Sequence, residues 1–193
     1  MITITPELLL KVAAPLYISN INKRNIQQTD CYALPFHMNH WFSVYDINRN
    51  KLRVAHFLAQ ACCETAGFLA LREDTDGKKY EPTTNAGRRV GNHLPGDGPK
   101  FIGRGLLHLT GRENYEKYGK ILGEDLVNHP ETVATNFSIA VRTACAFWVS
   151  RGLNTKADRD DFDGICHLIN GGPTGRERRR DALKKAKKAL QIS

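Results

Sequence analysis

The sequence lacks the features of a membrane-spanning, disulfide-stapled or disordered chain. None of its 193 residues belongs to a stretch that approaches the roughly 20 apolar residues of a transmembrane helix. The five cysteines are odd in number and include an adjacent pair, which argues against a disulfide framework. We interpret them as small buried thiols in a reducing cytosol. Hydrophobic residues make up 41% of the chain, so we expect one globular domain over residues 1–193.

Several well-known chemical motifs are also missing. The glycines at Gly103 and Gly105 have no preceding strand and no third spaced glycine, so they do not form a dinucleotide fingerprint. The chain has no P-loop, no CxxC pair and no HExxH pair, and we therefore expect neither a cofactor nor a metal. The N-terminus lacks the basic region of a signal peptide. We expect a chain made in the cytoplasm, which something else must release if it acts on a cell wall.

The positive charge is concentrated at the C-terminus. The net charge is +8, and residues 174–193 hold eight basic and two acidic residues, so this segment alone contributes 8 − 2 = +6. A basic protein is attracted to anionic polymers. No aromatic residues interleave with these charges, which makes nucleic acid an unfavoured partner. We predict a basic amphipathic helix that docks through its apolar stripe and has a basic face free for an anionic wall or outer-membrane surface.

Helical periodicity dominates the rest of the sequence. The strongest helix prediction covers residues 50–66, with Asn50 as a cap and Gly67 as the stop. Further helices are predicted at about 5–14, 30–45 with a possible break at Pro35, 111–122, 136–151, 160–169 and 175–190. Strand signals are few, so the fold class is mainly α. Glycine, proline and asparagine dominate residues 74–101, where we expect a loop-rich lobe with room for a small hairpin.

Glu64 is the first candidate for chemistry. It ends the apolar helix in CCETAGF, next to Cys62, Cys63 and Phe68. A carboxyl group against apolar surface is harder to ionise and can donate a proton near neutral pH. A glutamate in the last helical turn faces the negative end of the helix dipole, which gives it no local stabilisation. These features favour a functional group over a solvated charge.

The other candidates are weaker on local grounds. Glu73 could supply the second carboxylate that glycoside hydrolysis needs, but it lies in a common kind of acidic surface cluster. Thr110 and Glu113 have the spacing of a capping box, as do Thr174 and Glu177. A cap hydroxyl at a cleft could still hold a water molecule. Asn170 lies at a glycine turn and is equally suited to turn formation and to binding a sugar.

Several segments together resemble one family. They are FLAQACCETAGF, GRGLLHLTGRENY, LINGG, PGDGPKFIGRG and the opening TPELLLKVAAP. In this order they are similar to glycoside hydrolase family 19, in its phage endolysin branch. The resemblance implies a lysozyme-like helical fold with a loop-rich lobe beside the cleft. It also implies that Glu64 is the general acid, Glu73 the second carboxylate and Thr110 a holder of water.

The resemblance also implies the substrate contacts. His108, Asn114, Tyr115 and Asn170 fall where the family binds sugar, and Arg179 falls near its cleft arginine. Three positions depart from the family pattern: Cys63 replaces a usual histidine, His108 a common glutamine, and Arg178 an aspartate. These departures affect a sugar contact and the placement of Arg179.

The function expected from this resemblance is hydrolysis of the β-1,4 bonds of peptidoglycan, with inversion. The enzyme would be a monomeric endolysin that stays in the host cytoplasm until holin-type release to the wall. Three alternatives remain open: a chitinase, a lytic transglycosylase that uses one glutamate and no water, and a non-catalytic cationic protein that binds wall or membrane through residues 174–193.

Overall fold

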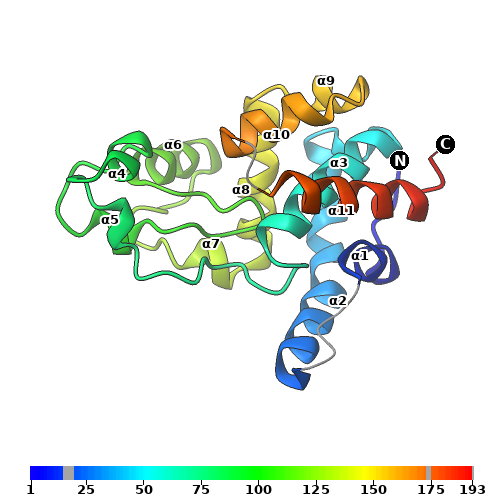
Figure 1. Cartoon of the computed structure of the whole chain (residues 1–193), viewed down its shortest axis with the longest axis horizontal. Helices are drawn as coiled ribbons and strands as arrows, with labels where there is room; N and C mark the ends of the chain where they lie inside the picture. Colours follow the sequence, from blue (N-terminus) through cyan, green and yellow to red (C-terminus); the bar gives the residue numbers. More distant parts are fainter. Residues whose placement is uncertain (15–19, 173–174, 193) are drawn as a thin grey trace.

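The computed structural model describes residues 1–14, 20–172 and 175–192, and these residues are mainly helical (Figure 1). The helices are α1 Pro6–Ala13, α2 Ile21–Val44, α3 Lys51–Glu64, α4 Asn85–Arg89, α5 Asp97–Lys100, α6 Arg112–Leu122, α7 Thr132–Thr135, α8 Phe137–Ser150, α9 Leu153–Asp158, α10 Phe162–Asn170 and α11 Arg176–Ala189, with 3₁₀ turns η1 Ile47–Arg49 and η2 Lys78–Tyr80. In this part of the chain, β-pairing is confined to two isolated antiparallel bridges, Arg72–Arg104 and Arg104–Leu109. The predicted mainly-α class is therefore confirmed. Within the same residues, no helix has both the length and the apolarity needed to cross a membrane.

Helix starts agree with the capping residues read from the sequence. Thr5 caps α1 by accepting from the amide of Leu8, and Asn50 caps α3 by accepting from the amide of Arg53. Two helix ends differ from prediction. α3 ends at Glu64, before Gly67, and α2 begins at Ile21 and runs through Pro35 without a break. Pro35 is buried, so packing against the core holds this long helix together across the proline.

Two other local predictions are wrong. The Thr110 capping box does not form, because Gly111 is the N-cap of α6 and the Thr110 hydroxyl donates to the carbonyl of His108 instead. The Thr174 box lies outside the described residues. Residues 74–101 contain short helices and turns instead of a hairpin. A minimal antiparallel pair occurs later, at the Arg104–Leu109 bridge.

Two hydrophobic clusters meet at α8. The main core joins α1, α2, α3, α8, α9, α10 and α11 and includes Phe57 and Trp148, whose rings lie 5.2 Å apart. The second cluster fills the loop-rich lobe and comprises Phe101, Leu109, Tyr115, Tyr118, Leu122, Leu126, Val133 and Ala146. α8 contributes side chains to both clusters, so it fixes one lobe relative to the other. The two lobes lie on either side of it in Figure 1.

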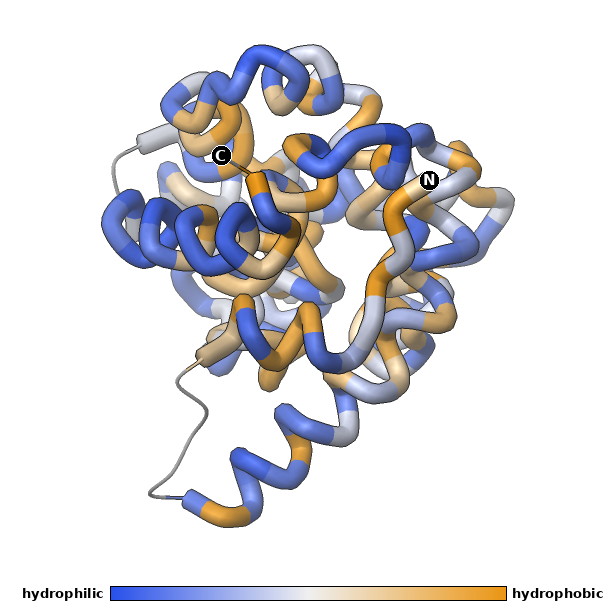
Figure 2. Tube along the Cα trace, turned by 90° about the vertical axis from the view of Figure 1, so that its right-hand side faces the viewer, coloured by the Kyte–Doolittle hydropathy of each residue, from blue (hydrophilic) through white to orange (hydrophobic). Residues whose placement is uncertain are grey.

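The basic C-terminal helix is docked, as its apolar stripe predicts. Ala182, Leu183 and Ala186 are buried where α11 packs against α3 and α1. Figure 2 shows the other residues of α11 as mostly hydrophilic. Ion pairs engage five of its eight cations: Arg176 and Arg180 with Asp163, Arg179 with Glu64, Lys185 with Asp181, and Lys187 with Asp160. More than half of the cations of this helix are therefore paired with acidic side chains of the chain itself.

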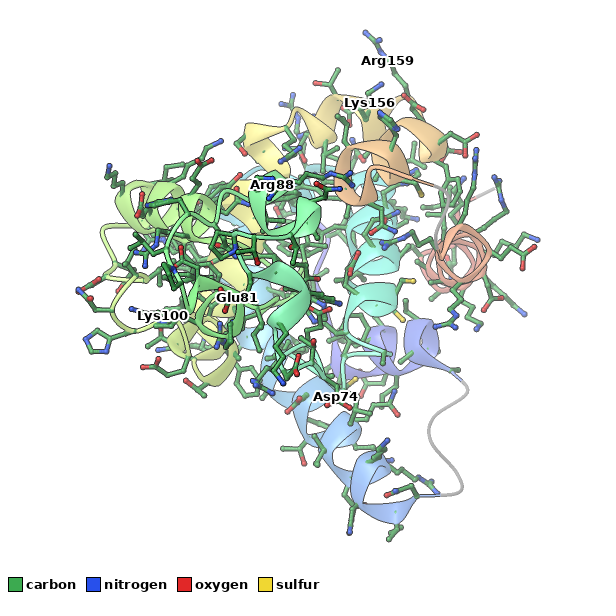
Figure 3. All side chains as sticks on the ribbon, turned by 60° about the vertical axis from the view of Figure 1, so that its left-hand side comes forward. Asp74, Glu81, Arg88, Lys100, Lys156 and Arg159 are labelled. Carbon is green, nitrogen blue, oxygen red and sulfur yellow. The ribbon has the colours of Figure 1, made fainter. Side chains whose placement is uncertain are left out.

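Charged side chains elsewhere are mixed in sign. Asp74, Glu81, Arg88 and Lys100 all come from the loop-rich segment and its borders, and Figure 3 shows them around that lobe. Buried Asp97 anchors the same lobe through Arg112, at 2.6 Å. Burial raises the pKa of Asp97, but the bonds from Arg112 and from the Leu94 and His93 amides outweigh it and hold that pKa below its usual range.

Candidate active site

An open cleft of about 750 Å³ lies between the two lobes. It is lined by Glu64, Glu73, Tyr80, Arg89, Val90, Leu107, His108, Leu109, Thr110, Asn114, Phe147, Arg151, His167, Leu168, Ile169, Asn170 and Gly171. These residues come from the end of α3, the loops 73–80 and 103–110, and helices α4, α6, α8 and α10 with the turn after it. Most site residues expected from the sequence therefore converge on one cleft.

Glu64 is held by a buried arginine from the other end of the chain. The Nη2 of Arg179 donates to Oε1 of Glu64 at 2.5 Å, and its Nη1 donates to the side-chain oxygen of Gln60 at 2.6 Å. The side chain of Arg179 is only 3% exposed, so solvent screens this pair weakly. The positive charge also offsets the unfavourable position of Glu64 at the C-terminal end of α3.

Gln60 is a functional neighbour that the sequence reading missed. It is fully buried on α3, one helical turn before Glu64, so both side chains reach the same guanidinium. Its amide nitrogen makes a contact of 3.5 Å with Sγ of Cys166. A polar residue within the apolar run FLAQACCE, four residues before the glutamate, was the signal that could have revealed it.

The turn after Glu64 has an unusual backbone. Ala66, Gly67 and Phe68 all have positive φ, at 51°, 83° and 63°. Non-glycine residues adopt this region at a cost and keep it only where surrounding structure enforces it. Here Gln27 donates to the carbonyl of Gly67 at 2.8 Å, and Phe68 is completely buried. This tight turn sends the chain from the acid on α3 directly across to the loop that holds Glu73.

Glu73 is held by its neighbours in sequence. Lys79 donates to Oε1 at 2.6 Å, and the Tyr80 hydroxyl lies 3.1 and 3.2 Å from the two oxygens. The amide of Gly103 donates to Oε2 at 3.4 Å. Burial, and then the charge of Glu73, raises the pKa of Tyr80, so Tyr80 is a neutral donor at ordinary pH. Neither Lys79 nor Tyr80 was expected from the sequence.

Thr110 and Glu73 converge beside Gly103. A Cβ atom built on Gly103 would lie 3.2 Å from Oε2 of Glu73 and 3.2 Å from Oγ1 of Thr110. The carboxylate of Glu73 and the hydroxyl of Thr110 therefore face the same small space beside the α-carbon of Gly103. The Thr110 hydroxyl donates to the carbonyl of His108 at 2.9 Å, which leaves its lone pairs available to accept. A side chain at position 103 would crowd this space.

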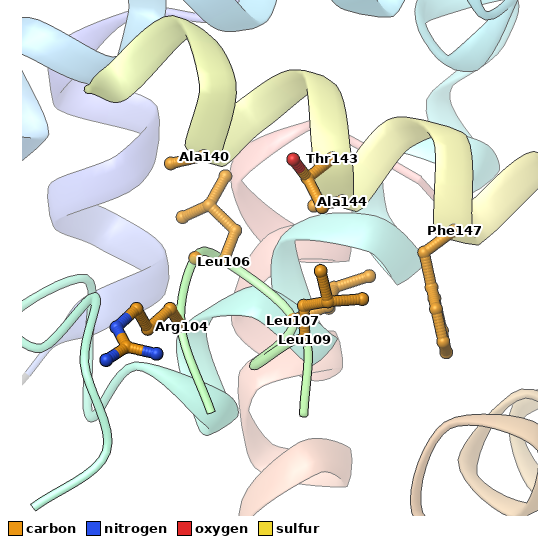
Figure 4. A pocket seen from close by; sticks show the side chains of 9 residues that line it. Arg104, Leu106, Leu107, Leu109, Ala140, Thr143, Ala144 and Phe147 are labelled. Atoms are coloured by element: carbon orange, nitrogen blue, oxygen red, sulfur yellow. The ribbon is translucent and has the colours of Figure 1, made fainter. Parts of the chain in front are cut away.

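The loop that carries Thr110 is anchored on α8. Leu106 and Leu107 belong to the main core, whereas Leu109 belongs to the second cluster. Figure 4 shows these leucines below Ala140, Thr143, Ala144 and Phe147, around a void of about 10 Å³. The void is about the size of one water molecule. Anchoring on both cores fixes the loop where the lobes meet.

His108 links the loop 103–110 to the end of α3 and the turn that follows it. Its φ is +46°, in the left-handed region. Its Nε2 lies 3.2 Å from the carbonyl of Ala70, which can only accept, so Nε2 carries a proton. The other ring nitrogen then faces Oε2 of Glu64 at 3.9 Å. The geometry places His108 beside the carboxyl group that we expect to donate the proton.

The expected sugar contacts divide into two groups. His108, Asn114 and Asn170 line the cleft. Tyr115 does not, and its assignment as a sugar contact is wrong. It is completely buried, donates to the carbonyl of Ile102 at 2.9 Å and accepts from Arg104 at 3.0 Å. Burial raises its pKa to about 12. Tyr115 faces inward because α6 presents that side to Phe101.

Two arginines on the rim of the cleft were also missed. Arg89 and Arg151 line the cleft and are exposed, and neither pairs with an acidic side chain in the described part of the chain. Arg151 stacks on Phe147, with the guanidinium carbon 4.7 Å from the ring centroid. Arg89 follows Arg88 and Arg151 directly follows α8, and neither position has a sequence pattern that predicts a cleft residue.

Two carboxylates line one open cleft, Glu64 in a buried basic network and Glu73 beside the Thr110 hydroxyl. This is the side-chain chemistry of a glycoside hydrolase, which protonates a leaving oxygen with one carboxyl group and uses the other opposite it. No group of three or more potential metal ligands occurs among residues 1–14, 20–172 and 175–192.

Comparison with known proteins agrees with this class. The family model of glycoside hydrolase family 19, described as chitinase class I, matches residues 33–164. A glycosyl hydrolase family 19 domain-containing protein of Haemophilus influenzae is 34% identical over 67% of this chain and 76% of its own length. An acidic 27 kDa endochitinase of Solanum lycopersicum is 33% identical over 66% of this chain, and the match spans about half, 56%, of that longer protein. The chain belongs to glycoside hydrolase family 19.

Solved structures show the same fold. Chitinase C from Streptomyces griseus HUT6037 superposes with a TM-score of 0.72 at 18% identity, covering 99% of this chain and 94% of that one. A class IV chitinase from Zea mays gives a TM-score of 0.60 at 22% identity, covering 94% and 85%. The lysozyme-like helical fold expected from the resemblance is therefore confirmed.

Proposed function

We propose that this glycoside hydrolase is an endolysin that cleaves the β-1,4 glycosidic bonds of bacterial peptidoglycan. The observation that carries the proposal is the fixed pair of Glu64 and Arg179, in one cleft with Glu73 and Thr110. Two features support an anionic glycan as substrate. The chain has a net charge of +8, and the cleft rim has two arginines, Arg89 and Arg151, that pair with no acidic side chain among the described residues.

In the proposed mechanism, Glu64 is the general acid. It transfers its proton to the glycosidic oxygen as the bond between that oxygen and the anomeric carbon breaks. Glu73 accepts a proton from a water held by Thr110, and this water attacks the anomeric carbon from the opposite face. The configuration inverts, which requires carboxyl groups roughly 6.5–9.5 Å apart. Arg179 orients the acid, and His108, Asn114 and Asn170 contact the sugars.

Chitin is the second candidate substrate. The support for it is that similar proteins are named endochitinases and that the solved neighbours are chitinases. The amides of Asn114 and Asn170 would suit the uncharged N-acetyl groups of either polymer. Chitin, however, offers no negative charge to Arg89 and Arg151, so these arginines favour peptidoglycan.

Two further hypotheses differ from this proposal in mechanism or in class of protein. A lytic transglycosylase would use Glu64 alone, and Glu73 and Thr110 would then have no role. A purely cationic wall-binding protein would act through α11, but five of the eight cations there are engaged in ion pairs. As part of this proposal, the enzyme acts as a monomer that leaves the host cytoplasm at lysis, with an auxiliary contact between α11 and an anionic surface.

The test is turbidity loss of purified cell walls stripped of outer membrane, with mass spectrometry of the products. We expect wild type to lyse the walls and release reducing ends, and Glu64→Gln to release none. Anhydro products would show that the enzyme is a lytic transglycosylase and not a hydrolase. Turnover of chitin oligomers without action on the walls would make the enzyme a chitinase. Equal lysis by both proteins would overturn the catalytic role of Glu64.

A further inference from the structure

A second groove begins at Glu64 and lies outside the main cleft. Its volume is about 480 Å³, and it runs between the end of α1, the end of α3 and the first half of α11. Its walls include Ala13, Cys63, Gly67, Arg178 and Lys185, and Glu64 lines both this groove and the main cleft. The candidate acid therefore stands where two grooves meet, and only one of them has a role in the mechanism above.

The second groove carries charges of both signs. Lys185 lies between the carbonyl of Ala14, at 2.6 Å, and the carboxylate of Asp181. Arg178 is exposed, and no acidic side chain among the described residues pairs with it. Arg178 lines the same groove as Cys63, at this end of α3. An unpaired guanidinium at the wall of a groove is a ready partner for a carboxylate.

Resting on the proposed function, we infer that this second groove binds the stem peptide of peptidoglycan, with Arg178 contacting a peptide carboxylate. A general acid must lie within hydrogen-bonding reach of the glycosidic oxygen. The two sugars that share this oxygen consequently lie beside Glu64, and a side branch on either sugar leaves the main cleft at that point. The second groove starts there.

Charge distinguishes this occupant from a plain glycan. A stem peptide carries several carboxylates, and one of them suits the guanidinium of Arg178, the cation of this groove that pairs with no acidic side chain among the described residues. Chitin has no branches and no charge, so it would leave the second groove empty. The groove would therefore select the peptide-bearing polymer without taking part in bond cleavage.

The experiment compares two forms of one substrate. Soluble, uncross-linked glycan strands with their stem peptides are assayed beside the same strands after amidase treatment, which removes the peptides. The variants are Arg178→Glu and the matched control Lys184→Glu, an exposed residue of the same helix that does not line the groove. Each variant removes one positive and adds one negative charge, so general attraction to the strands changes equally.

We expect Arg178→Glu to lower kcat/KM on peptide-bearing strands by about tenfold and Lys184→Glu to lower it by about twofold or less. On peptide-free strands the two variants should match. Equal losses for both variants on both substrates would overturn the inference. Arg178→Glu could also lose activity on peptide-free strands, because the new carboxylate competes with Glu64 for Arg179. In that case Arg178→Gln, which cannot compete for Arg179, must lose activity on peptide-bearing strands alone. If it does not, the inference is wrong.

Failure of the proposed function gives a different result. A wild-type enzyme that cleaves N-acetylglucosamine hexamers but neither form of the strands would refute peptidoglycan as substrate, and the inference with it. A wild-type enzyme that cleaves both forms, with a ratio that Arg178→Glu leaves unchanged, would refute the second groove alone.

Discussion

The two walls of the cleft hold their carboxylates in different ways. The side chains of Glu64 and Glu73 are similarly exposed, at 17% and 22%, but their cationic partners are not. Arg179 is 3% exposed and lies 115 residues from Glu64, whereas Lys79 is 54% exposed and lies six residues from Glu73. The acid therefore depends on tertiary packing, and the second carboxylate depends on a local loop. A fixed acid and a more adjustable water-binding wall would suit a cleft that must admit a long polymer.

The largest expected effect comes from the carboxyl groups themselves. Glu64→Gln should lower kcat by about 10³-fold or more, because the amide cannot donate a proton to the leaving oxygen. Glu73→Gln should cost about 10²-fold, since a water can still enter the open cleft and be held by Thr110. Both are measured as reducing ends released from cell walls. A Glu73→Gln variant with full activity would break the two-carboxylate assignment and favour a transglycosylase.

Removing each cation tests the comparison directly. Arg179→Leu should cost about 3 kcal/mol of unfolding free energy and about 10²-fold in activity. The substitution removes the hydrogen-bond donor that Glu64 and Gln60 share, and it lets the acid move. Lys79→Leu should cost less than about 1 kcal/mol, since Lys79 is half exposed and Glu73 keeps its contacts with Tyr80 and Gly103. Chemical denaturation and kcat report the two quantities. Similar stability losses in the two variants would contradict the contrast between a packed wall and a local one.

The hydroxyl of Thr110 should have an intermediate effect. Thr110→Val keeps the shape of the side chain but removes the group that would hold the water, so we expect kcat to fall about tenfold. Thr110→Ser restores a hydroxyl and should recover most of the activity. If the valine and serine variants are equally active, the hydroxyl of Thr110 does not hold the water, and Thr110 has only a structural role in its loop.

Tyr115→Phe should have the smallest effect on activity. The loss of hydrogen bonds to Ile102 and Arg104 should cost about 1 kcal/mol of stability, with KM unchanged, because the ring never reaches the cleft. The folded-state pKa of about 12 lies above the ordinary value of 10, so wild type loses stability as pH rises from 10 towards 12. The difference in unfolding free energy between wild type and Tyr115→Phe should shrink over that range. A raised KM would restore Tyr115 as a substrate contact.

Much of the fold followed from local sequence patterns. The caps at Thr5 and Asn50 and the apolar repeats of α3 and α11 gave helix positions to within a few residues. Failures arose where neighbours in space override local preference. Pro35 lies within α2 because packing buries it, and Gly111 displaces the capping box expected at Thr110.

The candidate site was predictable in part, through residues of specific type at specific spacing. Glu64, Glu73, Thr110, Asn114 and Asn170 line the cleft as the resemblance implied. Tyr115 was placed wrongly because sequence does not tell which face of α6 turns inward. Gln60 was missed because a buried glutamine is recognisable as functional only when its partner, Arg179, is known.

Periodicity and residue identity are enough to predict the mainly helical class, the docking stripe of the C-terminal helix and the side-chain chemistry available for catalysis. The pairing of charges, in contrast, followed from packing. Packing placed Arg179 against Glu64 and buried Tyr115, and among the described residues it left Arg89, Arg151 and Arg178 without an acidic partner at the two grooves. The physical reason is that electrostatic pairing depends on distance and burial, which packing sets between residues far apart in the chain.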